Sequence, residues 1–102
     1  MEDPMVVVAG WIDVDAKVRD AYLASRLEAM IATREEPGCV EYVFSADPID
    51  LERVRLFELW ESREDLDVHL QLLRSRATSS AAFEVVGREV LVYDVSNSGP
   101  IG

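Results

Sequence analysis

The sequence contains few of the residues from which disulfides, zinc sites and phosphate-binding loops are built. Its 102 residues include one cysteine, Cys39, and one histidine, His69. An internal disulfide is therefore excluded, and no zinc site with paired ligands is expected. The 5 glycines form no phosphate-binding fingerprint, so we expect no bound nucleotide, flavin or metal cofactor.

Long apolar runs are also missing. No run approaches the roughly 18 residues that a membrane-spanning helix needs. The opening residues, MEDPM, have neither the basic region nor the apolar region of a secretory signal. Together with the single cysteine, these absences predict a cytoplasmic protein.

Positive charge is scarce. Lys and Arg total 10 against 20 Asp and Glu, which gives a formal net charge of −10. Such a surface repels phosphate backbones and anionic lipid, so we expect neither nucleic acid nor membrane as a partner. The same balance favours a neutral aromatic substrate over an anionic one, unless arginines such as Arg53, Arg55, Arg74 and Arg76 form a local basic rim.

The apolar pattern predicts the order strand, helix, strand, strand, helix, strand. Strands are expected over residues 5–12, 40–46, 53–61 and 89–95, and helices over residues 16–34, from Ser62 onward and, briefly, within 76–86. Four strands with helices on one face give an α+β, ferredoxin-like βαββαβ sandwich with a four-stranded antiparallel sheet. We expect one domain over residues 1–102, with its core at about 5–95 and a tail at 96–102.

The helices are expected to present one apolar face each. In the first, Leu23, Leu27, Met30 and Ile31 form a stripe at helical spacing, and Arg26 lies off it. The second begins with Ser62 as a cap, and its spacing places His69 on the apolar side.

The sheet has a second face that these helices cannot cover. Its first and last strands are nearly continuously apolar, so Val, Leu and Trp side chains would meet water. At about 25 cal/mol per Å² this exposure costs several kcal/mol, and a second copy packed face to face removes it. The sequence therefore predicts a homodimer, the alternative being a monomer with an unusually apolar face.

Three side chains are candidates for chemistry. His69 titrates near neutrality and suits proton transfer, although a lone histidine on an apolar face is often structural. Glu58 and Trp60 share one face of the preceding strand, and with His69 they could line one cavity. The aromatic residues expected to complete an apolar pocket are Trp11, Tyr42, Phe44 and Tyr93.

Several short motifs together resemble a known family. The segments are EPGCVEY at 36–42, DP at 47–48, FELWES at 57–62, DVHL at 67–70 and VVVAGW near the start. As a set, spanning roughly residues 5–95, they resemble the antibiotic biosynthesis monooxygenase (ABM) family of the dimeric α+β barrel superfamily, which includes quinol monooxygenase-like proteins. The resemblance implies a ferredoxin-like subunit that dimerises through its sheet and holds a pocket between sheet and helices.

The resemblance also implies an activity. Characterised members oxidise quinol or polycyclic aromatic substrates with molecular oxygen and use neither flavin nor metal. On that basis Trp60 and the pocket aromatics would position the ring, and His69 or Glu58 would assist proton removal. Two alternatives stay open: a small-metabolite isomerase or lyase using His69 and Glu58 as acid and base, and a ligand-binding dimer without catalysis.

Overall fold

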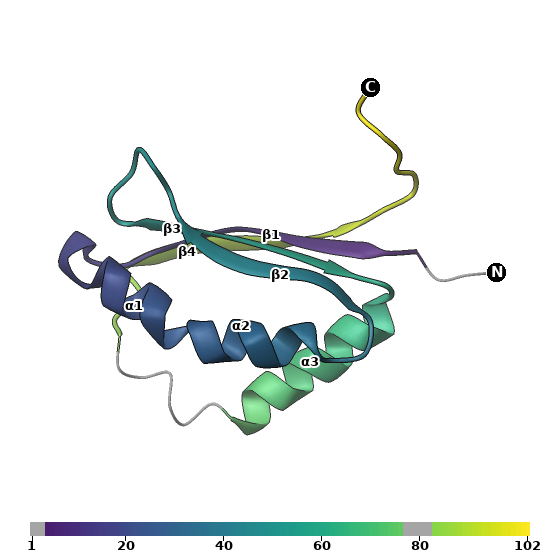
Figure 1. Cartoon of the computed structure of the whole chain (residues 1–102), viewed down its shortest axis with the longest axis horizontal. Helices are drawn as coiled ribbons and strands as arrows, with labels where there is room; N and C mark the ends of the chain where they lie inside the picture. The colour runs from purple at the N-terminus through teal and green to yellow at the C-terminus, as the bar shows by residue number, and fades with distance from the viewer. Residues whose placement is uncertain (1–3, 77–82) are drawn as a thin grey trace.

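The computed structural model describes residues 4–76 and 83–102 (Figure 1). The elements are β1 (Val6–Asp13), a 3₁₀ turn η1 (Ala16–Val18), α1 (Arg19–Ser25), α2 (Leu27–Arg34), β2 (Cys39–Ala46), β3 (Arg53–Trp60), α3 (Arg63–Ser75) and β4 (Gly87–Asp94). The predicted order and the ferredoxin-like α+β fold are confirmed. The short helix expected within residues 76–86 lies mostly outside the described residues.

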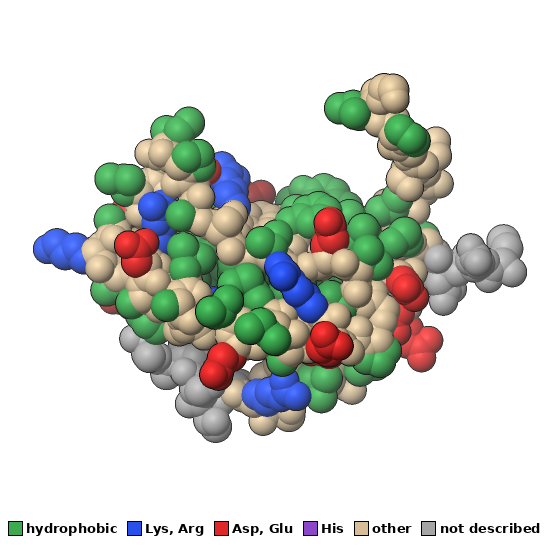
Figure 2. Space-filling view, viewed as in Figure 1, with side chains coloured by type: hydrophobic (Ala, Val, Ile, Leu, Met, Phe, Trp, Pro, Cys, Tyr) green, Lys and Arg blue, Asp and Glu red, His purple; other side chains and the backbone are tan. Residues whose placement is uncertain are grey.

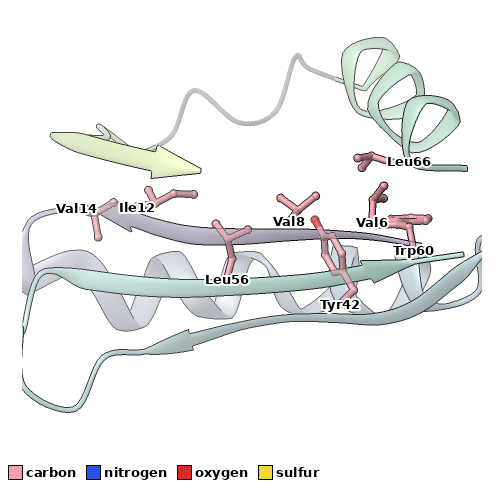
Figure 3. Packing of buried hydrophobic residues seen from close by; sticks show 8 residues of the cluster. All are labelled: Val6, Val8, Ile12, Val14, Tyr42, Leu56, Trp60 and Leu66. Carbon is pink, nitrogen blue, oxygen red and sulfur yellow. The ribbon is translucent and has the colours of Figure 1, made fainter. Parts of the chain in front are cut away.

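The four strands form one antiparallel sheet in the order β2-β3-β1-β4. The helices of the described residues all lie against the same face of the sheet, and the C-terminal residues leave on the opposite side (Figure 1). Side chains alternate across a strand, so one face of β1 and β3 supplies the core. Buried hydrophobic residues of this core are Val6, Val8, Ile12, Val14, Tyr42, Val54, Leu56, Trp60 and Leu66. Figure 3 shows all of them except Val54.

The first helix differs from its prediction in continuity and in orientation. It is interrupted at Arg26, between α1 and α2. Leu27 and Ile31 are 56% and 60% exposed, whereas Tyr22 and Met30 pack against the core. The predicted stripe was therefore only partly right: Met30 faces the core, whereas Leu27 and Ile31 do not, because the face that the helix presents to the sheet includes Arg26.

The second helix follows its prediction closely. The Ser62 hydroxyl accepts a hydrogen bond from the Asp65 backbone N–H at 3.1 Å and donates one to the Asp65 carboxylate at 2.9 Å. These bonds cap α3 and fix where it begins. As the spacing predicted, Leu66 and His69 are buried on its inner side.

The outer face of the sheet is left uncovered by the described helices (Figure 1). Val43, Leu91 and Tyr93 are each more than a third exposed. Figure 2 shows hydrophobic side chains along the upper side of the molecule, away from the helices, and also across the centre of the view. Among the described residues, no helix is long and apolar enough to cross a membrane.

Candidate functional site

A cavity of about 320 Å³ lies between the helix-facing side of the sheet and the helices. Its volume is that of a small-molecule site, and its walls are mainly apolar. The lining residues are Val8, Ile12, Tyr22, Arg26, Tyr42, Phe44, Leu56, Glu58, Leu66, Leu70, Leu73, Arg88, Val90 and Val92. Few of these side chains are polar, so each polar one has a large influence on which ligand the cavity can bind.

Strand register arranges the cavity floor in rows. One row crosses the sheet through Tyr42, Glu58, Val8 and Val92. The row two residues further along joins Phe44 to Leu56 and Gly10 to Val90, and the next joins Ile12 to Arg88. The cavity therefore has an acidic end at Glu58, an aromatic middle at Phe44 and a basic end at Arg88.

Glu58 is a buried acid on this floor. Its side chain lies among apolar neighbours, the residue is 7% exposed, and it accepts a hydrogen bond of 2.9 Å from the Trp60 indole Nε1–H. Burial raises the pKa of Glu58, and the Trp60 hydrogen bond offsets part of that rise. Because its pKa is raised, the Glu58 carboxylate is a stronger base than an exposed glutamate. It is therefore better suited to accept a proton from a ligand.

Trp60 and His69 lie behind Glu58 and do not line the cavity. Both are essentially inaccessible to solvent, and their rings stack with centroids 4.8 Å apart. The His69 Nδ1–H donates to the Glu36 carboxylate at 2.9 Å, since a carboxylate can only accept. Among the described residues, the buried Nε2 of His69 has no partner. The three candidate residues are thus brought together, but only Glu58 reaches the cavity.

The turn before β2 holds this arrangement in place. Glu36 bonds to His69 from this turn, and Gly38 has a φ of +81°, a conformation that side chains disfavour. A Cβ at Gly38 would collide with the Asp65 side chain at the start of α3. The EPG segment therefore joins the end of α2 to α3 by close packing and one partly buried hydrogen bond.

Tyr42 and Phe44 line the cavity, as the sequence predicted. Their ring centroids are 5.5 Å apart, and the Tyr42 ring meets His69 edge-on at 5.4 Å. Burial raises the pKa of Tyr42 to about 12, so its hydroxyl stays protonated near neutral pH. These two rings offer an aromatic wall and one hydroxyl donor.

Trp11 and Tyr93 do not line this cavity, contrary to the prediction. Both lie on the outer face of the sheet, beside a separate shallow depression. Val8 on β1 and Val92 on β4 face the cavity. Trp11 is three residues from Val8, and Tyr93 is next to Val92. Side chains an odd number of residues apart on a strand point to opposite faces, so Trp11 and Tyr93 point away from the helices. Aromatic character alone could not distinguish the two faces.

The basic residues of the cavity were missed by the sequence analysis. Arg26 and Arg88 line it, whereas none of the arginines expected to form a basic rim does: these are Arg53 and Arg55 on β3, and Arg74 and Arg76 at the end of α3. Arg53 and Arg55 pair instead with Asp13 and Asp47. The spacing of Arg26 could have indicated its position. It follows Tyr22 by four residues and precedes Met30 by four, which puts all three on one helix face.

The fold and cavity define a class: ferredoxin-like α+β proteins with a cavity between sheet and helices. Residues 5–81 match the model of the antibiotic biosynthesis monooxygenase family, and the chain belongs to that family. An uncharacterised protein of Synechocystis is 36% identical over 70 residues, which are 69% of this chain. The chain covers 47% of the length of that relative.

Solved structures have the same fold. An antibiotic biosynthesis monooxygenase-like protein of Deinococcus radiodurans superposes with a TM-score of 0.82 at 19% identity, covering 95% of this chain and 98% of the other. A haem-degrading protein of Mycobacterium tuberculosis, with two haems in its active site, gives 0.72 at 19% identity, covering 95% and 100%. At these identities the likeness concerns the fold alone.

A metal ion or a haem iron needs side chains that are placed to coordinate it. His69 is the single histidine of the sequence, and it is bonded to Glu36 behind the cavity. Among the described residues, no group of three His, Cys, Asp or Glu side chains could hold a metal ion. No histidine is therefore placed to coordinate the iron of a haem within the cavity.

Proposed function

We propose that this protein is a cofactor-independent monooxygenase that oxidises a quinol or a polycyclic phenol with molecular oxygen. The observation that carries the proposal is Glu58, a buried carboxyl with a raised pKa that lines a mainly apolar cavity. Family membership and an aromatic wall at Tyr42 and Phe44 support the same activity.

The chemistry assigns Glu58 the role of base. It accepts the proton of a phenolic hydroxyl, and the electron-rich phenolate then reduces oxygen. One oxygen atom enters the ring at a C–H carbon, and the other leaves as water with the two hydrogens lost from the O–H and C–H groups. The substrate supplies all the electrons, and an apolar cavity protects the reactive intermediate from water.

Trp60 and His69 act on Glu58 as positioning residues. The Trp60 N–H holds one carboxylate oxygen, and His69 stacks against the indole while Glu36 fixes its ring. The family resemblance implied that His69 or Glu58 assists proton removal. We propose Glu58 for this role, because a base must reach the ligand.

The first test is oxygen consumption with a panel of naphthols and quinols. Glu58→Gln keeps an acceptor for the Trp60 N–H and removes the base, so kcat is expected to fall about 10²–10⁴-fold. Glu61→Gln, at an exposed position, is the matched control and should keep full activity.

Two outcomes would contradict the proposal. One is oxidation by Glu58→Gln at the wild-type rate. The other is turnover of a substrate without oxygen uptake, which would assign the cavity to an isomerase or lyase. Ligand binding with no turnover across the panel would favour a binding protein.

The uncovered sheet face supports a second proposal, a homodimer. Val43, Phe57, Ala9 and Leu91 form an apolar row across all four strands on that face. A second copy is the simplest partner for such a surface, since a symmetric dimer needs no other protein.

A further inference from the structure

We propose that the ligand of the cavity carries a carboxylate, which is bound by Arg26 and Arg88. This inference deepens the proposed function and rests on it for the choice of an aromatic ligand. It reverses the expectation from the net charge of −10, which favoured a neutral one. The local charge inside the cavity, rather than the charge of the whole surface, decides what the cavity binds.

Arg26 is a cation placed inward at the junction of α1 and α2. Its guanidinium carbon lies 5.0 Å from the centroid of the Phe44 ring, which also lines the cavity. Its Nε is buried and, among residues 4–76 and 83–102, has no hydrogen-bond partner. Within the same ranges, Arg26 forms no salt bridge. A buried donor without a partner is costly, and a ligand acceptor would remove that cost.

Arg88 supplies a second cation from β4. It is the register partner of Ile12, so it stands on the helix-facing side of the sheet. Arg26, Arg88 and Tyr22 all line the cavity, and both cations act electrostatically on the Tyr22 phenol. In the described part of the chain, Arg88 also lacks a carboxylate partner, unlike Arg53 and Arg55.

The charges do not balance without a ligand. Two guanidinium groups face the cavity against one acid, Glu58, so the lining carries a positive charge in excess even when Glu58 is ionised. A planar guanidinium presents parallel N–H donors that match a carboxylate, and such charge-assisted bonds are stronger in an apolar cavity than in water. A carboxylate therefore complements this end of the cavity better than a neutral group does.

The spacing of the rows orients the ligand. Val8, opposite Glu58, and Ile12, opposite Arg88, are four residues apart on β1, which is about 13 Å along the strand. Aromatic and aliphatic side chains of Phe44 and Leu56 lie between them. The ligand class is therefore a fused-ring phenol whose hydroxyl lies at Glu58 and whose carboxylate lies between Arg26, which stands over the Phe44 ring, and Arg88.

Calorimetric titration with two probes tests this inference. The probes are naphthalene-2-carboxylate and 2-naphthamide, which have the same ring and differ in charge. The carboxylate is expected to bind wild-type protein at least about tenfold more tightly than the amide. Arg26→Met and Arg88→Met should each weaken carboxylate binding about tenfold and leave amide binding nearly unchanged. Arg63→Met is the control, because the Arg63 guanidinium pairs with Asp67 on the exposed side of α3.

Three outcomes would overturn the inference. They are equal affinity for the two probes, no binding of either probe, and equal losses of affinity for both probes in the arginine variants. Arg88 is exposed, so its variant keeps the test valid even where Arg26→Met perturbs folding. The titration needs no turnover. Carboxylate selectivity without oxygen consumption would leave this inference standing and reject the monooxygenase.

Discussion

At the scale of single residues, the site depends on one buried acid and the donor that holds it. Glu58 is kept in the cavity wall by a hydrogen bond from Trp60, and its burial and that bond shift its pKa in opposite directions. Trp60 is fully buried and His69 nearly so, and neither lines the cavity. Their influence on a reaction is therefore exerted through the position and the pKa of Glu58.

Trp60→Phe is expected to move the pH profile of activity to higher pH. The base acts as a carboxylate, so activity rises as pH rises through the pKa of Glu58. Removing the N–H donor destabilises the carboxylate, and the rise should shift up by about 1 pH unit. The measurement is kcat/KM against pH for the wild type and the variant.

Trp11→Phe is the matched control for this shift. Trp11 lies on the outer face under Arg53, with the guanidinium carbon 3.8 Å from its ring centroid. Its variant should keep the wild-type pH profile. An unshifted profile in Trp60→Phe would show that the indole has only a packing role.

At the scale of elements, the turn between α2 and β2 joins the site to the rest of the fold. Its backbone carbonyl at Gly38 accepts a 2.8 Å hydrogen bond from the Glu61 N–H, at the end of β3. Its glycine lies against Asp65, in the first turn of α3, and its Glu36 holds His69. One short segment thus sets the relative positions of β3, α3 and the His69 ring.

Gly38→Ala is expected to lower the free energy of unfolding by about 1–3 kcal/mol. The added methyl group would force a positive φ on an L side chain and would collide with Asp65. Urea denaturation followed by circular dichroism measures the change. Gly99→Ala, where nothing lies within 4 Å, should have almost no effect, and equal stability of the two variants would contradict the packing argument.

At the scale of the whole molecule, the apolar content is distributed over two faces of one sheet. The helices of residues 4–76 cover the inner face and leave the outer face open (Figure 1). Among the described outer-face residues, Leu91 and Tyr93 on β4 remain nearly half exposed. The edge strand β4 is therefore the part of the sheet that a partner copy would protect most.

Sedimentation at micromolar concentration is expected to give twice the chain mass of 11.4 kDa. Phe57→Asp places a charge at the centre of the outer face, opposite Ala9 and Val43, and should shift the protein to the mass of one chain. Leu27→Asp, an exposed apolar position on α2, is the control and should stay dimeric. A wild-type protein that sediments as a single chain would refute the dimer.

Much of the fold was predictable from local pattern. Alternation in β3 placed Glu58 and Trp60 on one face, and helical spacing placed His69 inward, because both depend on repeats of two and 3.6 residues that the sequence displays directly. The Ser62 cap was equally local.

The composition of the cavity was not predictable in the same way. Alternation separates the faces of a strand but does not say which face a helix will cover, so Trp11 and Tyr93 were assigned to the wrong side. The sequence also did not indicate which face of the first helix packs against the sheet, because an arginine, Arg26, occupies that face. Both questions are answered only by contacts between segments far apart in the chain.

The sequence by itself therefore determined the elements, their order, the scarcity of metal and disulfide chemistry, and the apolar character of both sheet faces. Tertiary structure alone decided that Glu58 meets the cavity while Trp60 and His69 stand behind it. It also decided that two arginines without carboxylate partners among the described residues face inward in an acidic protein. The physical reason is that secondary structure follows local periodicity, whereas burial and charge pairing depend on which distant surfaces pack together.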